Sequence, residues 1–105
     1  MVQSSHNYYL VILEGVNMAK ILQDISIGGN LRAIRKRRKL TQNDVCAQMA
    51  QLGRPMLQST YAQIESGSRN IFVSDLIALK RVLHVEYSEF FQGLEPVNKY
   101  TEEPE

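Results

Sequence analysis

Residues 58–67, Gln-Ser-Thr-Tyr-Ala-Gln-Ile-Glu-Ser-Gly, decide the fold, because they predict a short helix with two different faces. Tyr61 and Ile64 stand three positions apart, which places both on one side of a helix, where they can be buried. The remaining faces carry three uncharged polar side chains, those of Gln58, Ser59 and Gln63. A glutamine amide presents a donor and an acceptor in one plane, the pattern that grips an adenine edge in the major groove of DNA. The alternative for the two glutamines is an ordinary solvated helix surface.

The composition bounds the class of protein. A chain of 105 residues is long enough for one domain with tails. Its one cysteine, Cys46, cannot form an internal disulfide and fits a reducing compartment. The apolar run Tyr8–Leu13 is far too short to cross a bilayer, and no secretion leader pattern is present. We therefore expect a cytoplasmic protein without a membrane segment.

The net charge of +1 conceals an asymmetry along the chain. Residues 26–94 hold ten Lys and Arg against five Asp and Glu, a net charge of +5. Residues 95–105 hold four Glu against one Lys, a net charge of −3. Six of the ten positive charges lie between Arg32 and Lys39, a patch able to face a polyanion. The alternative is a solvated helix face.

Two helices are expected before the opening stretch. The first spans about residues 27–38, and its apolar stripe comprises Ile27, Leu31 and Ile34. Thr41 is a good N-cap for the second helix, with Asp44 as a shortened capping-box partner. The inward stripe of the second helix comprises Val45, Met49 and Leu52. Gly53 and Pro55 stop this helix, and Cys46 beside the stripe is expected as a core residue rather than a nucleophile.

Two further helices are expected after it. Ser74 and Asp75 predict the start of the fourth helix. Its buried face comprises Leu76, Leu79 and Leu83. His84 follows directly and is expected to close the helix in the left-handed conformation, a metal or catalytic role being the alternative. A short fifth helix carries apolar side chains that serve as core, dimer contact or both, those of Tyr87, Phe90, Phe91 and Leu94.

The two ends of the chain differ from this helical part. Residues 1–25 form an N-terminal arm or extension, in which Tyr8–Leu13 is rich in strand formers: an added strand, a hydrophobic arm or a non-native extension. Residues 14–16 can be encoded by a purine-rich stretch of the kind that recruits bacterial ribosomes, and Met18 follows. We therefore hypothesise that residues 1–17 are an upstream translation, which N-terminal sequencing of the protein from its host would test. Residues 95–105 predict a short, disordered acidic tail.

The ordered set of elements resembles the Cro/phage-repressor type of helix-turn-helix domain, also called the lambda-repressor-like fold. The resemblance covers about Ile27 to Leu94. It is carried by Leu31-Arg32-Ala33-Ile34-Arg35, Leu40-Thr41-Gln42, residues 59–67, and the pattern of residues 79–83 and 87–91. It implies an all-α, compact five-helix domain over residues 26–94.

The resemblance also implies roles by position. Gln42 looks like the family glutamine that clamps a DNA phosphate, and a helix N-terminus favours phosphate binding. The positions that contact DNA bases are those of Gln58, Ser59 and Gln63. The positions that contact the DNA backbone are those of Thr60, Arg69 and Asn70. Arg35 and Glu65 match a family pair that forms a partly buried ion pair between the first and third helices.

The chain departs from the family pattern between the second and third helices. The spacing from Gln42 to Gln58 is longer than usual by about five residues. Either the second helix is extended, or the turn is a true loop containing Arg54 and Pro55. Leu57 stands where an N-capping serine or threonine is usual. The longer turn resembles that of a subgroup of bacterial regulators.

The leading hypothesis is a sequence-specific DNA-binding transcriptional regulator, a repressor of a bacterial or mobile-element operon. It would bind a palindromic double-stranded operator as a homodimer, with half-sites about 34 Å apart. The alternative is a protein-interaction module on the same fold, such as an antirepressor or antitoxin, because fold does not dictate function. The sequence carries no catalytic constellation, metal-ligand cluster or phosphate-binding glycine loop. We therefore expect neither an enzyme nor a cofactor, a metal or a small-molecule ligand.

Overall fold

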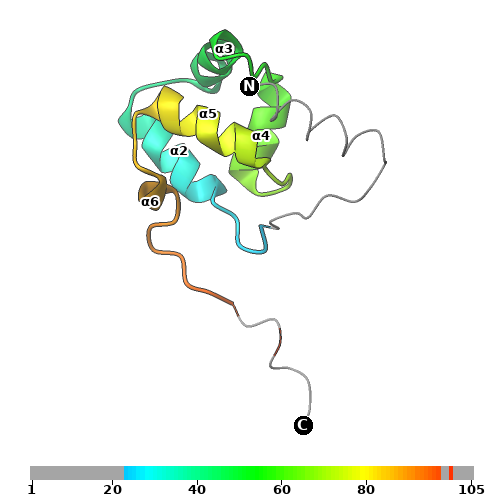
Figure 1. The fold of residues 1–105 in the computed structure, drawn as a ribbon, viewed down its shortest axis with the longest axis vertical. Coiled ribbons are helices and arrows are strands. Elements are labelled where there is room, and N and C mark those ends of the chain that lie inside the picture. The colour runs from blue at the N-terminus through cyan, green and yellow to red at the C-terminus, as the bar shows by residue number, and fades with distance from the viewer. Residues whose placement is uncertain (1–22, 98–99, 101–105) are drawn as a thin grey trace, which may run out of the picture.

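The structure is a computed structural model that describes residues 23–97 and residue 100. Within this part of the chain there are five α-helices and no strand (Figure 1): α2 (Gly28–Arg37), α3 (Gln42–Gln51), α4 (Gln58–Ser66), α5 (Val73–Leu83) and α6 (Tyr87–Phe90). The predicted all-α, five-helix class is thereby confirmed. The predictions for residues 1–17 and for most of the acidic tail fall outside the described residues.

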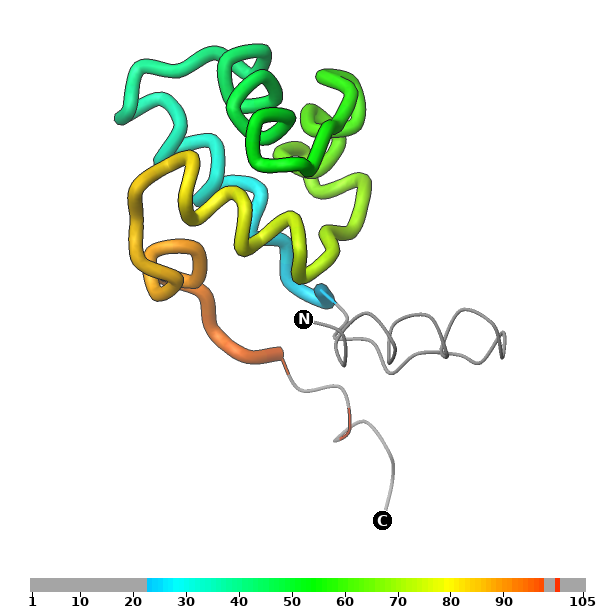
Figure 2. The backbone as a smooth tube through the Cα atoms, turned by 45° about the horizontal axis from the view of Figure 1, so that its top comes forward, coloured from blue at the N-terminus to red at the C-terminus, as the bar shows by residue number. Residues whose placement is uncertain are grey.

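Helices α3 and α4 pack against each other and lie side by side. α2 packs against α4, α3 packs against both α4 and α5, and the short α6 packs against α2. The segments before α2 and after α6 both leave the helical body at the end away from α3 (Figure 2). These segments therefore emerge away from α3, and the segment before α2 passes the C-terminal end of α4, where Gln23 bonds Asn70.

One apolar core joins the helices. Its fully buried large side chains are Leu31, Val45, Met49, Tyr61, Ile64, Leu79, Leu83 and Phe90. The predicted stripe of α3 is correct for Val45 and Met49 but wrong for Leu52, which is 47% exposed. The reason is that α3 ends at Gln51, so the chain has already left the helix at Leu52. Of the predicted α6 residues, Phe90 is core, whereas Tyr87 and Phe91 are exposed.

The start of α3 and the ends of α4 and α5 follow the sequence predictions. The Thr41 hydroxyl accepts from the Asp44 N–H at 3.0 Å, and the Asp44 carboxylate accepts from the Thr41 N–H at 2.8 Å. Hydrogen bonds from Thr41 hold the pKa of the Asp44 carboxyl below its ordinary value. Gly67 (φ 84°) closes α4 and His84 (φ 56°) closes α5, both in the left-handed conformation.

The predicted start of α5 is two residues too late. Phe72, not Ser74, occupies the N-cap position, and the helix begins at Val73. The carboxylate of Asp75 accepts from the Phe72 N–H at 3.1 Å. An acid at the third helical position can satisfy the free N–H at the helix start by itself, which is the capping box without its usual hydroxyl partner.

The first turn of α2 lies directly on the backbone at the end of α4. A Cβ atom placed on Gly28 would lie 2.2 Å from the Glu65 carbonyl oxygen and 2.6 Å from that of Ile64. Only a residue without a side chain allows this approach. The position of α4 is therefore tied closely to that of α2.

Polar side chains of α2 connect it to the C-terminal part of the domain. Arg38 donates from Nε to the Leu83 carbonyl at 2.9 Å and from Nη2 to the His84 carbonyl at 2.6 Å. A cation at these carbonyls is favourable because they form the negative end of α5. Asn30 donates to the Phe90 carbonyl at 2.8 Å and so holds the end of α6.

Candidate nucleic-acid interface

Helix α4 presents its polar face to solvent. Its buried stripe consists of Tyr61, Ile64 and Glu65, and the side chains of Gln58, Ser59 and Gln63 are exposed, while Thr60 is half-buried. Gln58 and Gln63 are five positions apart, which separates them by roughly 140° around the helix. The two glutamines therefore project from different edges of the exposed face.

A buried ion pair lies behind this face. Arg35 of α2 donates from Nε to Glu65 Oε2 at 2.6 Å and from Nη2 to Glu65 Oε1 at 3.0 Å, a bidentate geometry. The two side chains are 9% and 3% exposed. The remaining nitrogen, Nη1, donates to the Leu40 carbonyl at 2.9 Å. The pair expected from the family resemblance is thus present, and it joins α2 to α4.

Electrostatics keep this pair charged. Burial alone would raise the pKa of Glu65, but its hydrogen bonds, that from Arg35 foremost, outweigh burial and leave this pKa below its ordinary value. The hydrogen bond to Glu65 likewise raises the pKa of Arg35. A carboxylate that accepts several hydrogen bonds stays ionised even where water is largely excluded. Glu65 is therefore a fixed negative charge at the back of α4.

The ion pair continues outward through two glutamines. Gln42, the first residue of α3, donates from Nε2 to Glu65 Oε1 at 3.0 Å. Gln58 donates from Nε2 to Gln42 Oε1. The row Arg35, Glu65, Gln42 and Gln58 therefore runs from the core to the exposed start of α4. The Glu65 carboxylate, held by Arg35, thereby orients the amide groups of Gln42 and Gln58.

A second group forms at the other end of α4. Arg69 donates from Nε to Gln63 Oε1 at 2.8 Å. The neighbouring Asn70 Oδ1 accepts from the Ile71 N–H at 3.0 Å and from Gln23 Nε2 at 3.1 Å. The structure thus brings Gln58 to Gln42 and Gln63 to Arg69, whereas Asn70 is bonded to the segment before α2.

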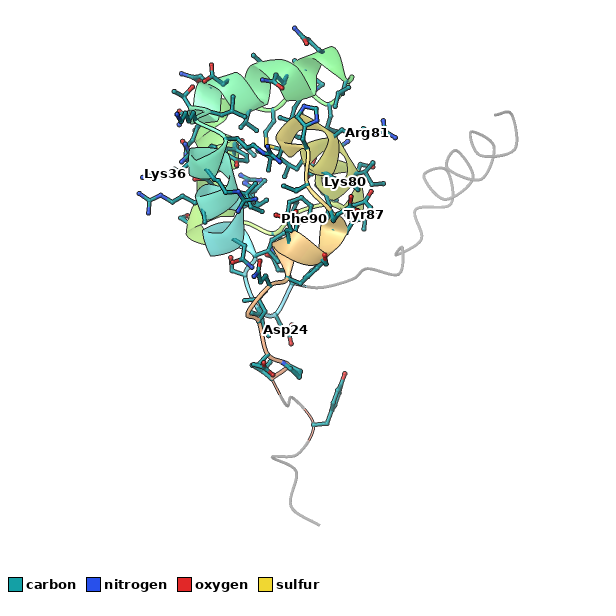
Figure 3. The ribbon with its side chains drawn as sticks, turned by 90° about the vertical axis from the view of Figure 1, so that its left-hand side faces the viewer. Asp24, Lys36, Lys80, Arg81, Tyr87 and Phe90 are labelled. Carbon is teal, nitrogen blue, oxygen red and sulfur yellow. The ribbon has the colours of Figure 1, made fainter. Side chains whose placement is uncertain are left out.

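The basic cluster of residues 32–39 is partly structural. Arg35 is in the buried pair, Arg37 bonds Glu89 at 2.8 Å and Arg38 bonds the end of α5, so three of its six charges have partners inside the domain. The exposed charges of Arg32, Lys36 and Lys39 remain. Figure 3 shows Lys36 and Arg81 on opposite sides of the body. The outward positive charge is thus smaller and more dispersed than the sequence count indicates.

The longer turn between α3 and α4 is a true loop, residues 52–57, because α3 has only ten residues. It contains a contact that the sequence did not indicate. Arg54 donates from Nε to Asp75 Oδ1 of α5 at 2.6 Å. Asp75 carried only a capping signal, and nothing in the spacing pointed from it to a loop arginine twenty-one residues earlier.

The chain belongs to the helix-turn-helix family, of the Cro/phage-repressor type. The family profile matches residues 31–90, which include most of α2 and all of α3 to α6. Membership of this family supports a DNA-binding transcriptional regulator. Among solved structures, the restriction-modification controller protein C.AhdI from Aeromonas hydrophila is similar. It is 25% identical with a TM-score of 0.55, and the match covers 62% of this chain and 91% of that chain.

No curated protein matches the chain. Among residues 23–97 and 100, no helix has the length and apolar character needed to cross a membrane. In the same described part, no three His, Cys, Asp or Glu side chains are grouped in a way that could hold a metal ion.

Proposed function

We propose that this protein is a sequence-specific repressor of a bacterial or mobile-element operon, with α4 in the major groove of its operator. The observation that carries the proposal is the row from the buried Arg35–Glu65 pair through Gln42 to Gln58. A base-contacting amide must be held in one orientation, because its donor and its acceptor pair with different atoms on the edge of the base.

The row favours adenine as the partner of Gln58. One N–H of its amide is donated to Gln42, which leaves the second N–H and the carbonyl oxygen of this exposed side chain available to a base. Adenine offers an acceptor, N7, and a donor, the N6 amino group, to this pair of atoms. Gln63 differs, since Arg69 occupies its oxygen and leaves its two N–H groups as donors. Gln63 therefore favours a base acceptor, and Ser59 between them would contact bases of either kind.

The DNA backbone is expected on both sides of α4. Gln42 stands at the N-terminus of α3, where free N–H groups and the helix dipole favour a phosphate. Arg69, Thr60 and Asn70 are proposed to contact the backbone at the other side, adding affinity that does not depend on sequence. One short contact helix favours a homodimer on a palindrome, with half-sites about 34 Å apart, and a DNA target in turn implies the cytoplasm.

A second candidate is a protein-interaction module such as an antirepressor or antitoxin. An apolar hollow of about 370 Å³ favours it. The hollow is lined by Ile25, Phe72, Phe91 and Leu94, among others, and Phe72 is 69% exposed. Exposed apolar surface of this kind often marks a protein contact.

Selection of binding sites from a random duplex pool tests the proposal. We expect a palindromic sequence to be enriched, with adenine opposite Gln58. Gln58→Ala should weaken binding to that sequence by about 1–3 kcal/mol and leave random-duplex binding almost unchanged. Gln51→Ala, at an exposed glutamine on α3, is the matched control and should change neither. A pool without enrichment, together with no retention on heparin at low salt, would favour the interaction module instead.

A further inference from the structure

The start of α4 lacks the usual local anchor. Leu57 occupies its N-cap position, makes no side-chain capping hydrogen bond and is 73% exposed. The preceding loop, residues 52–57, is long enough to allow alternative paths. Contacts from outside the helix must therefore fix where α4 begins.

Arg54, in the middle of this loop, is attached at both its backbone and its side chain. Its N–H donates to the Met49 carbonyl in the last turn of α3 at 2.9 Å. Its Nε donates to Asp75 at 2.6 Å, and its guanidinium carbon lies 5.7 Å from the centre of the Phe72 ring. That distance allows a cation–π contact. Arg54 thus links the end of α3 to the start of α5 across the loop.

Asp75 gives this link its strength. Its side chain is 4% exposed, whereas that of Arg54 is 39% exposed. The second carboxylate oxygen accepts from the Phe72 N–H, so the group is fixed by the first turn of α5. A carboxylate buried this far requires a positive partner, because an unpaired buried charge is strongly unfavourable.

Met56 of the loop packs against the core, but the surface between the loop and α4 is hollowed. A hollow of about 370 Å³ lies at this place, and its lining includes Arg54, Leu57, Thr60 and Arg69. Thr60 and Arg69 are two of the proposed contacts to the DNA backbone. A shift of the loop would therefore reach the surface proposed to meet DNA.

We propose that Arg54 is a positioning residue for DNA recognition, which clamps the α3–α4 loop to Asp75 and so fixes the start of α4. This inference rests on the proposed function. It assigns Arg54 no contact with DNA, although its guanidinium is partly exposed. The competing role, a direct phosphate contact, is an outcome of the experiment below.

The double variant Arg54→Met/Asp75→Asn removes the ion pair without leaving a lone buried charge. Methionine keeps an apolar stem beside Phe72, and the asparagine oxygen can still accept from the Phe72 N–H. In the full chain we expect about tenfold weaker binding to the selected sequence, as for a displaced contact group, with random-duplex binding and its salt slope unchanged. Arg81→Met, which removes an exposed charge from α5, should leave the ratio of the two affinities unchanged.

Two results would overturn the inference. Unchanged binding to the selected sequence would show that the clamp is not needed. Equal losses on both DNAs with a salt slope lower by about one would make Arg54 a phosphate contact.

Amide hydrogen exchange of the DNA-free protein tests the clamp independently of DNA binding. The Tyr61 N–H donates to the Leu57 carbonyl at 3.0 Å and reports on the first turn of α4. The double variant should speed its exchange about tenfold relative to the Leu31 amide of α2, since local opening can occur without global unfolding. Equal acceleration at both amides would show general destabilisation and contradict positioning. If the unaltered protein selects no sequence, the proposed function fails, and this exchange ratio still decides whether the clamp exists.

Discussion

Replacing Arg35 by methionine should destabilise the domain far more than losing an ordinary surface ion pair. The side chain of Glu65 is 3% exposed. Without Arg35, the hydrogen-bonded row offers its carboxylate only the Gln42 amide as a donor. Removal of one partner from a buried pair costs about 3–5 kcal/mol. A domain of this size has a total stability of about 5–15 kcal/mol, so the loss is a large fraction of it. The melting temperature should fall by about 12 °C or more.

Urea unfolding at neutral pH, followed by circular dichroism, measures this effect. Arg37→Met is the matched control, because the Arg37–Glu89 pair has a similar length, 2.8 Å, but its side chains are 56% and 34% exposed. An exposed pair contributes about 1 kcal/mol at most. The double variant Arg35→Met/Glu65→Gln should recover most of the lost stability, since it buries no charge.

The two comparisons separate the possible causes. A loss in Arg35→Met no larger than that in Arg37→Met would refute the argument from buried charge. A double variant as unstable as Arg35→Met would show that the guanidinium matters for its shape and its bond to the Leu40 carbonyl rather than for neutralising Glu65.

Three further predictions concern single positions. The pKa of Glu65 is lowered on folding, so the pair stabilises the domain above the ordinary carboxyl pKa of about 4.5. This stability is lost as pH falls through the lower pKa of the folded state. The urea midpoint of Glu65→Gln should therefore depend less on pH in this acid range than that of the unaltered protein. Gly28→Ala should lower the free energy of unfolding by about 1–3 kcal/mol through overpacking against α4. Gly29→Ala, at a position with open space around it, should be neutral or stabilising. If both variants were stabilised in thermal melts, the close approach of Gly28 to α4 would be disproved. Arg69→Ala should lower the salt slope of DNA binding by about one unit, and an unchanged slope would remove Arg69 from the phosphate contacts.

Features that depend on neighbouring residues could be predicted from the sequence. The capping box of Thr41 and Asp44 spans one helical turn, and its residue types are specific for a helix start. Tyr61 and Ile64 were correctly placed in the core because three-residue spacing decides which side of a helix is buried. The left-handed His84 follows from its place directly after a periodic apolar run.

Features that depend on distant partners were missed or overestimated. The count of positive charges in residues 32–39 cannot show that Arg37 faces Glu89 or that Arg38 caps α5, because both partners lie far away in the chain. Leu52 fits the spacing of α3 but follows its last residue. The Arg54–Asp75 contact arises from a loop path that no periodic pattern encodes.

The contact of Gly28 with the Ile64 and Glu65 carbonyls limits how this protein could acquire a new target. Since the C-terminal end of α4 cannot move toward α2 without a collision, altered specificity should come more readily from exchanging the outward side chains than from moving this end of the helix. An engineer who transplants the exposed residues of another regulator onto positions 58, 59 and 63 should therefore succeed more readily than one who remodels the helix itself.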